Sequence, residues 1–211
     1  MFRDRRDAGQ KLGEALDHYK RCDGVVLAIP RGGVEVGYYV AEHLELPLSI
    51  IVVRKLPLPA NPEAGFGAIA EDGSVFFVER FAGSLSPAVV RRIIKKQRHE
   101  IQRRIEVLRG GKPLPAIGGK IAILVDDGIA MGSTMRAAVE LCRTRKAGMI
   151  VVAAPVASPA AAAEFAAIAD EAVILEEPPF FRAVAETYEN WYDVPDDEVI
   201  RVLQKARRQD L

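Results

Sequence analysis

The segment IAILVDDGIAMGST, residues 121–134, restricts the fold of this chain more than any other part of the sequence. Five apolar residues, 121–125, end in two adjacent carboxylates, Asp126 and Asp127, and a loop of mainly small residues follows. An uninterrupted apolar run of this kind is typical of a strand buried on both faces of a parallel sheet. We therefore expect a sheet whose edge carries two paired acids, followed by a helix.

The loop after the paired acids predicts an anion site. It comprises Gly128, Ile129, Ala130, Met131, Gly132, Ser133 and Thr134. Small residues let backbone N–H groups turn inward, and a helix that begins near Gly132 adds unpaired N–H groups and the positive end of its dipole. Carboxylates repel phosphate but accept hydrogen bonds from sugar hydroxyls, so the segment predicts a site for ribose 5-phosphate. The alternative is an ordinary strand-to-helix turn, which would need one capping Asp and no such loop.

Strands and helices alternate along the rest of the chain. Apolar runs predict strands at 24–29, 48–53, 75–78, 149–154 and 172–175. Apolar spacing and capping residues predict helices at 5–20, 34–44, 86–108, 159–169 and 195–208, with another directly after the loop. This alternation favours an α/β fold with a doubly wound, mainly parallel sheet covered by helices on both faces. A length of 211 residues suits a single domain, 1–211.

Two further strand ends carry residues suited to anions. The first predicted strand ends in PRGG, which holds Arg31, Gly32 and Gly33, and the second ends in Arg54 and Lys55. Glycines allow close approach of the backbone to a ligand, and the carboxyl ends of parallel strands meet at one edge of a sheet. We expect these residues to lie beside the paired acids, although a plain turn and two solvated cations are the simpler interpretations.

The acidic pair and its loop resemble the phosphoribosyl-diphosphate (PRPP) binding motif of type I phosphoribosyltransferases. That motif consists of hydrophobic residues, an acid pair and a loop ending T-G-G/S-T. PRGG resembles the pyrophosphate loop of the family, which often holds a cis peptide, and the Arg-Lys pair resembles the cations beside it. The resemblance implies transfer of the 5-phosphoribosyl group from PRPP to a nitrogenous base, with release of pyrophosphate.

The resemblance also implies a role for each residue. Asp126, Asp127 and Lys55 would be catalytic, with the two acids holding the ribose hydroxyls. Residues 128–134 would bind the 5-phosphate. Pyrophosphate would be held by Arg31, Gly32, Gly33, Arg54 and Lys55. Mg²⁺ would be bound chiefly through PRPP and pyrophosphate, because His18, His43 and His99 show no metal-ligand spacing.

Two other regions have counterparts in the family. Residues 56–67 are rich in Pro and Gly, which indicates a flexible loop, and family members carry a lid at this place. Residues 176–211 loosely resemble the C-terminal hood of hypoxanthine-guanine phosphoribosyltransferases, where a base stacks. Phe180 and Phe181 are therefore candidate base contacts, with packing in the core as the alternative.

Two departures leave a second function open. Ala130 stands where the purine enzymes carry an Asp that takes a proton from the base, and Met131 replaces the usual Thr. Met131 removes a side-chain donor to the phosphate, and Ala130 removes the acid–base residue, so both departures favour binding over catalysis. A non-catalytic regulatory protein that binds PRPP or a nucleotide is therefore the alternative to a transferase.

Composition limits the partners. The 29 basic and 29 acidic residues balance, which gives no global attraction to nucleic acid or membranes. Residues 89–109 form a basic stripe beside an apolar one, which indicates a solvated helix face more than an RNA site. The separated Cys22 and Cys142 and the lack of a signal peptide suggest a cytoplasmic protein with reduced thiols. The family often forms dimers, so a homodimer stays open.

Overall fold

A five-stranded parallel sheet forms the centre of the molecule. The computed structural model describes residues 1–78, 81, 83 and 85–209. In spatial order the strands are β2 (Leu48–Ile50), β1 (Gly24–Ala28), β6 (Ile121–Val125), β7 (Met149–Val156) and β8 (Glu171–Glu176). The chain crosses over between neighbouring strands, and all four pairings are parallel. The predicted doubly wound α/β sheet is confirmed.

Alternate residues of the central strands pack on opposite faces. On β1 and β6, Val26 pairs with Ile123 and contributes to one core, while Leu27 contributes to the other. Both cores are apolar, and burial of apolar surface stabilises the sheet from each side at about 25 cal/mol per Å². Continuous apolar runs are the consequence, as expected for strands without a solvated face.

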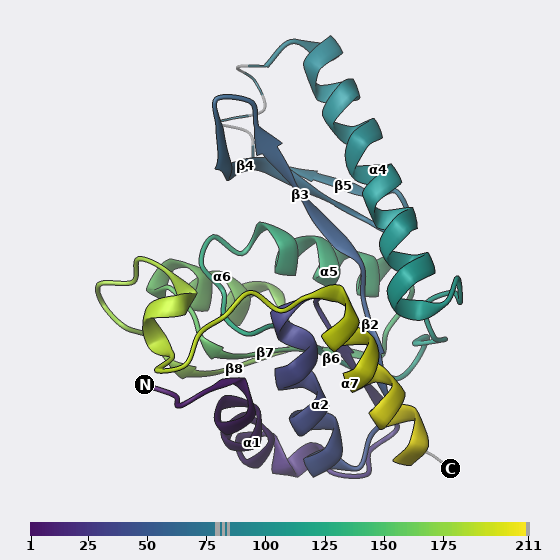
Figure 1. The fold of residues 1–211 in the computed structure, drawn as a ribbon, viewed down its shortest axis with the longest axis vertical. Coiled ribbons are helices and arrows are strands. Elements are labelled where there is room, and N and C mark those ends of the chain that lie inside the picture. Colours follow the sequence, from purple (N-terminus) through teal and green to yellow (C-terminus); the bar gives the residue numbers. More distant parts are fainter. Residues whose placement is uncertain (79–80, 82, 84, 210–211) are drawn as a thin grey trace.

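Helices cover both faces of the sheet (Figure 1). One face is covered by α1 (Arg5–Ala15) and α2 (Gly32–Leu44), with α7 (Asp196–Gln209) beside α2. The other face is covered by α5 (Ser133–Thr144) and α6 (Pro159–Ile168). Side chains cap the N-termini of α1 and α6. The carboxylate of Asp4 accepts a hydrogen bond from the N–H of Asp7, and the hydroxyl of Ser158 accepts one from the N–H of Ala161. No helix in the described ranges has both the length and the apolar character to cross a membrane.

A second, antiparallel sheet corrects the prediction of a loop at 56–67. It contains β3 (Val53–Leu58), β4 (Asn61–Ala70) and β5 (Val75–Phe77), so most of the expected loop forms a hairpin. Leu56 and Phe66 are fully buried in the core shared with the helix α4 (Pro87–Arg109). Pro57 and Gly67 made this segment resemble a loop, but both have a place in the strands. Pro57 lies at a register shift, and a Cβ at Gly67 would collide with a backbone oxygen of β5.

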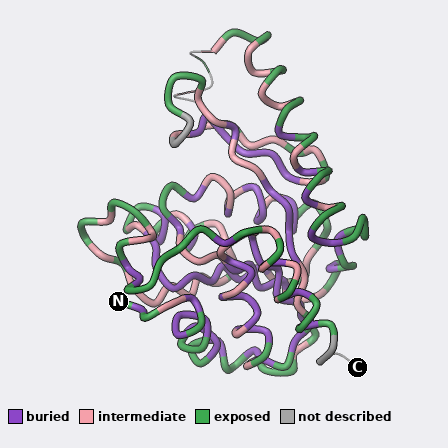
Figure 2. Tube along the Cα trace, viewed as in Figure 1, coloured by how far each residue is buried: buried purple, intermediate pink, exposed green. Residues whose placement is uncertain are grey.

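The hairpin also moves Arg54 and Lys55 from their predicted place. β2 ends at Ile50, and the two cations lie on β3 instead of closing a strand of the parallel sheet. β3, β4, β5 and α4 project from the body of the molecule (Figure 1). Figure 2 shows exposed residues along the outer part of α4. Its fully buried residues begin only at Gln97, so the base of this projecting part is packed more tightly than the outer turns of α4, where Val90, Ile93 and Ile94 are only partly buried.

The predicted hood region is helical in two segments. After β8 it holds a short 3₁₀ helix, η2 (Val184–Thr187), and then α7. The final two residues of this region, 210–211, lie outside the described residues. A second 3₁₀ helix, η1 (Asp17–Tyr19), follows α1 and explains why the first helix ends earlier than predicted.

Candidate active site

The acidic pair and the PRGG turn meet at the edge of the parallel sheet. The N–H of Asp127 donates to Oδ1 of Asp126 over 2.9 Å. A Cβ at Gly33 would lie 2.9 Å from that same oxygen, and one at Gly32 would collide with the carboxylate of Asp127. Both glycines are therefore required for the turn to approach the acids. The peptide bond between Pro30 and Arg31 is cis.

Sequence reasoning missed Arg5, which holds one of the two acids. Its Nε donates to Oδ2 of Asp127 over 2.9 Å, and its side chain is only 3% exposed. The carboxylate of Asp127 is 14% exposed. The two residues are 122 positions apart, so no local spacing in the sequence could reveal the pair. The start of α1 thus supplies a counter-charge to the end of β6.

Aromatic residues near the C-terminus enclose Arg5. Its guanidinium lies 4.0 Å from the ring centroid of Trp191, and its Nη1 donates to the backbone oxygen of Tyr192. The hydroxyl of Tyr188 donates to the backbone oxygen of Asp127 over 2.6 Å. These three aromatic residues of the predicted hood pack around the ion pair. Their contacts with Arg5 and with the backbone of Asp127 hold the ion pair in place.

The environment shifts the protonation of both acids. Burial, followed by the charge of Asp127, raises the pKa of Asp126 well above its ordinary range. Burial also raises the pKa of Asp127, but the charge of Arg5 and its hydrogen bond oppose that rise. Of the two acids, Asp127 is therefore the one whose ionised form its surroundings stabilise more.

The predicted phosphate loop lines a cavity of about 220 Å³. Its lining consists of Lys55, Asp126, Val184 and all seven residues 128–134. Gly132 takes a left-handed backbone conformation (φ 72°) directly before α5, so the loop lies at the N-terminus of that helix. The hydroxyl of Ser158 donates to the backbone oxygen of Ala130 over 2.7 Å, which fixes the far side of the loop.

The predicted cations are distributed around this cavity. Lys55 lines it, together with Asp126. The Nε of Arg54 donates to Oε1 of Gln97 on α4, so that guanidinium lies in a neighbouring cleft. Arg31 is 40% exposed, and its side chain lies 3.9 Å from the carboxylate of Asp196. Of the three predicted cations, Lys55 therefore lines the cavity of the loop, whereas Arg54 and Arg31 lie outside its lining.

The candidate base contacts lie away from the cavity lining. Phe180 is 90% exposed and Phe181 is half-buried, and neither lines the cavity. The residue of this segment that does line it is Val184, which packs so closely on Gly128 that a Cβ there would collide. Met131 is 54% exposed at the mouth of the loop. The role of the two phenylalanines stays a prediction.

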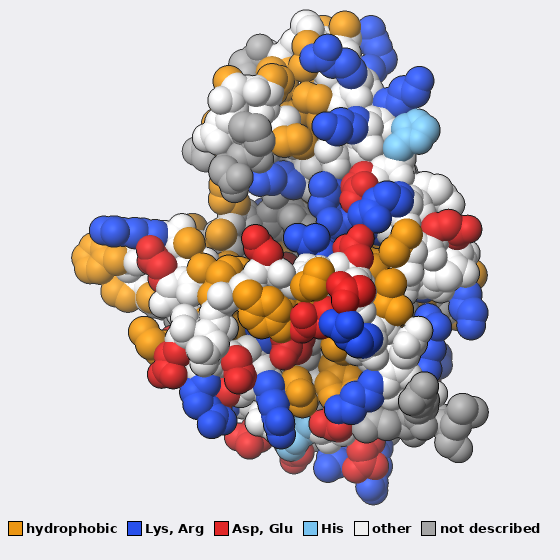
Figure 3. Space-filling view, viewed as in Figure 1, with side chains coloured by type: hydrophobic (Ala, Val, Ile, Leu, Met, Phe, Trp, Pro, Cys, Tyr) orange, Lys and Arg blue, Asp and Glu red, His pale blue; other side chains and the backbone are white. Residues whose placement is uncertain are grey.

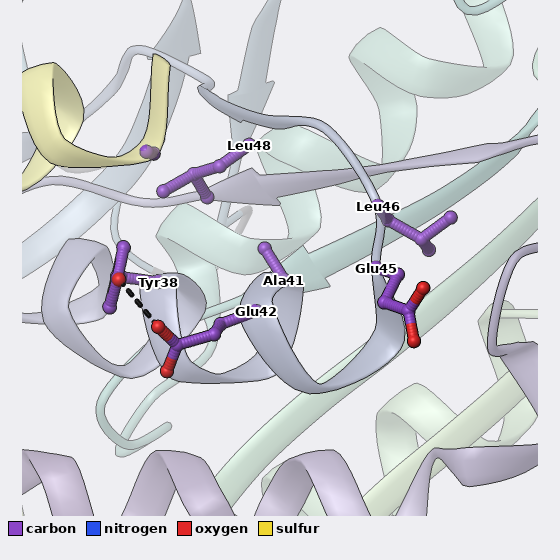
Figure 4. A pocket seen from close by; sticks show the side chains of 7 residues that line it. Tyr38, Ala41, Glu42, Glu45, Leu46 and Leu48 are labelled. Carbon is purple, nitrogen blue, oxygen red and sulfur yellow. Dashed lines mark hydrogen bonds between the residues drawn. The ribbon is translucent and has the colours of Figure 1, made fainter. Parts of the chain in front are cut away.

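A separate pocket of about 320 Å³ lies along α2 (Figure 4). Tyr38 and Glu42 line it, and the tyrosine hydroxyl donates to the carboxylate over 2.7 Å. Glu45 adds a second carboxylate, and among the described residues no Lys or Arg lines this pocket. This chemistry does not suit a sugar phosphate.

The donor set near the acids fits a magnesium ion held mainly by its ligand. Among the described residues no group of three His, Cys, Asp or Glu side chains is placed to bind a metal. Asp127 already accepts a hydrogen bond from Arg5. Mg²⁺ commonly combines one or two carboxylates with phosphate oxygens and water, and Asp126 is the carboxylate that faces the cavity.

Comparison with known proteins extends over nearly the whole chain. A protein of Mycobacterium tuberculosis strain H37Rv, named as a candidate phosphoribosyl transferase, is 42% identical over 210 residues. The match covers 99% of this chain and 47% of that protein, so the chain spans about half the length of the curated relatives it matches.

Solved structures share the fold. TT1426 from Thermus thermophilus is 38% identical, has a TM-score of 0.82, and is matched over 97% of this chain and 98% of that one. A Neisseria gonorrhoeae protein crystallised with ppGpp is 14% identical, with a TM-score of 0.50 over 98% of this chain and 99% of that one, which shows a common fold alone. The model of the phosphoribosyl transferase domain matches residues 5–186. The chain belongs to the phosphoribosyl transferase family.

Proposed function

We propose that the protein transfers the 5-phosphoribosyl group of PRPP to a nitrogenous base and releases pyrophosphate. The observation that carries this proposal is the cavity in which Asp126, Lys55 and the loop 128–134 meet. An amide-lined loop at a helix N-terminus suits a phosphate, and a carboxylate beside it suits the hydroxyls of the attached ribose.

Each residue of the cavity has a role in this proposal. The loop 128–134 anchors the 5-phosphate. In its ionised form, Asp126 accepts hydrogen bonds from the ribose hydroxyls and stabilises the positive charge that develops on the ring. The carboxylate of Asp127 accepts a hydrogen bond from Arg5, which fixes the backbone after β6, and it adds negative charge to the site. Lys55, also at the cavity wall, lies where the leaving group departs.

The pyrophosphate would be received by groups on two elements. The amides of Gly32 and Gly33 and the guanidinium of Arg31 come from the PRGG turn, and Arg54 and Lys55 come from β3. Mg²⁺ bound to the diphosphate oxygens would neutralise part of their charge. Cations and turn amides beside the acids are the arrangement that a departing anion needs.

The acceptor is proposed as a flat nitrogenous heterocycle, with Phe180 and Phe181 as its candidate contacts. Both belong to the segment that also sends Val184 to the cavity. Aromatic faces suit heterocycles, and a movement of this segment would be needed to bring them to the ribose. We propose the cytoplasm as the compartment, where PRPP and free bases are available.

A panel of bases with labelled PRPP and Mg²⁺ tests the proposal. Release of pyrophosphate that depends on one base, and that is lost in Asp126→Asn, supports the transferase. The absence of PRPP binding at millimolar concentration would reject it.

The second candidate is a regulatory protein that binds PRPP or a nucleotide without turnover. Ala130 favours it, because the position offers no proton acceptor near a base and its side chain is exposed. Tight PRPP binding without pyrophosphate release for any base in the panel would support the regulator over the transferase.

A further inference from the structure

Asp196, the first residue of α7, lies between the PRGG turn and α4. Its Oδ2 accepts a hydrogen bond from Nη1 of Arg103 over 3.1 Å, and its Oδ1 lies 3.9 Å from Nη1 of Arg31. One carboxylate thus faces a guanidinium of the projecting part and another of the body of the molecule. Figure 3 shows acidic and basic side chains next to one another where these two parts meet.

The Oδ1 atom of Asp196 is buried and has no hydrogen-bond partner among the described residues. A buried carboxylate oxygen without a partner costs free energy, because burial removes its hydrogen bonds to water. The hydrogen bond from Arg103 fixes the other oxygen of the carboxylate, so Oδ1 stays directed at Arg31. The stability of α7 alone does not account for an oxygen in this place.

Acidic residues in the first turn of a helix commonly serve only to stabilise its positive dipole end. Asp197, in the same turn, fits that simpler role, because its side chain is 65% exposed and pairs with Arg201 on α7 itself. The side chain of Asp196 is 27% exposed, and its carboxylate faces two arginines of other elements. The two neighbouring acids therefore differ in what they contact.

The PRGG turn is contacted by both of the helices that Asp196 joins. Arg104 of α4 donates to the backbone oxygen of Pro30 over 3.4 Å, and Asp196 of α7 faces the side chain of Arg31. Within the described part of the chain, no other acidic side chain lies within 4 Å of the Arg31 guanidinium. A guanidinium has five N–H donors, so an approach to Asp196 through Nη1 leaves most of them for a phosphate ligand.

We propose that Asp196 is a positioning residue, which orients the guanidinium of Arg31 toward the pyrophosphate group of PRPP. This inference rests on the proposed function for the role of Arg31 itself. Asp196 does not contact the ligand and acts through Arg31. Without this carboxylate, a partly exposed guanidinium samples several rotamers, and a diphosphate must restrict them when it binds. The loss of Asp196 should therefore weaken the binding of a diphosphate.

Calorimetric titration of inorganic pyrophosphate with Mg²⁺ into the wild type, Asp196→Asn, Arg31→Ala and the double variant tests the proposal. We expect Asp196→Asn to bind pyrophosphate about fivefold more weakly than the wild type, as for the cost of ordering one long side chain. In the Arg31→Ala background the same substitution should have no further effect, because Asp196 acts through Arg31. Asp197→Asn is the matched control, since it removes a charge from the same helical turn and should bind pyrophosphate like the wild type.

Equal affinity of the Asp196 and Asp197 variants for pyrophosphate would overturn the inference, as would a wild type that binds no pyrophosphate. Tighter binding by Asp196→Asn would also overturn it, because the carboxylate would then compete with the ligand for Arg31. An equal loss with and without Arg31 would make the role of Asp196 purely structural.

Failure of the proposed function is seen in a different measurement, the binding and turnover of PRPP. A protein that binds pyrophosphate but not PRPP would contradict the proposed function. A dependence of the Asp196→Asn effect on Arg31 would in that case still support the positioning of Arg31 at a diphosphate site.

Discussion

The two sides of the candidate site are held in different ways. On the side of the parallel sheet, the acids follow a fully buried strand, and Asp127 is tied to Arg5, which is itself enclosed by aromatic rings. On the other side, Arg54 on the projecting part donates to the uncharged amide of Gln97 and forms no salt bridge among the described residues. The charge of Asp127 is thus fixed by a partner inside the protein, whereas that of Arg54 is available for the anion that we propose.

The projecting part is connected to the body by polar contacts at its base. Arg109, at the end of α4, pairs with Glu71 after β4 and donates to the backbone oxygen of Ile50 over 3.0 Å. Arg104 donates to the backbone oxygen of Pro30 in the PRGG turn. The comparison therefore predicts a rigid acidic side and a basic side that can open about these contacts.

The largest effect is expected from Arg5→Met. Removing this guanidinium leaves the buried carboxylate of Asp127 without its counter-charge, which should cost about 4 kcal/mol of unfolding free energy. Urea denaturation measures the loss. Arg3→Met is the control, because Arg3 is 71% exposed and should change stability by less than about 0.5 kcal/mol. Similar stability of the two variants would show that the acidic side does not depend on this pair.

A smaller effect, seen in catalysis, is expected from Asp126→Asn. The amide keeps the shape of the side chain but lacks the charge that stabilises the ribosyl ring, so kcat/KM should fall roughly a hundredfold. Steady-state assay of pyrophosphate release measures the change. A rate within a factor of about two of the wild type would remove Asp126 from the mechanism.

Glu71→Gln should loosen the projecting part alone. Glu71 accepts the backbone N–H of Val52 and pairs with Arg109, both nearly buried, and loss of its charge should cost about 2 kcal/mol. Amide hydrogen exchange should become faster in β3–β5 and α4 while β6 and β7 stay protected. Exchange that rises equally in both sheets would contradict the division into two differently held sides.

The smallest effect is a pH dependence of stability at Asp126. The native pKa of this residue is raised above 3.8, so the folded state binds its proton more tightly than the unfolded state does. The cost of ionising it is absent below the unfolded pKa and grows as the pH rises toward the native pKa. Relative to the wild type, Asp126→Asn should therefore become progressively more stable as the pH rises from about 4, the unfolded pKa, toward neutrality.

Thermal unfolding across that pH range measures the gain. Asp23→Asn is the control, since its side chain is 80% exposed. A difference between wild type and Asp126→Asn that does not change with pH would place Asp126 in a more solvated environment than the structure indicates.

The sequence was sufficient to predict the parts of the molecule that depend on local pattern. Continuous apolar runs identified the parallel strands, and small residues after Asp127 identified the loop. The meeting of PRGG with the acids followed from the common direction of parallel strands. Gly32 and Gly33 are needed there, because a side chain would enter the space of the carboxylates.

The remaining features depend on contacts between distant residues. Arg5 and Asp127 lie too far apart in the chain for spacing to connect them. The hairpin of β3 and β4 was mistaken for a loop, because Pro57 and Gly67 are common loop residues. Its strands are stabilised by burial of Leu56 and Phe66 against α4, a tertiary effect that local propensity does not contain.

The central claim is that Asp126 and the loop 128–134 together bind one ribose 5-phosphate. A crystal structure of the protein soaked with ribose 5-phosphate tests this most directly. We expect the phosphate within hydrogen-bonding distance of the backbone N–H groups of the loop and the ribose hydroxyls on the carboxylate of Asp126. A sugar phosphate bound elsewhere while this cavity stays empty would contradict the account.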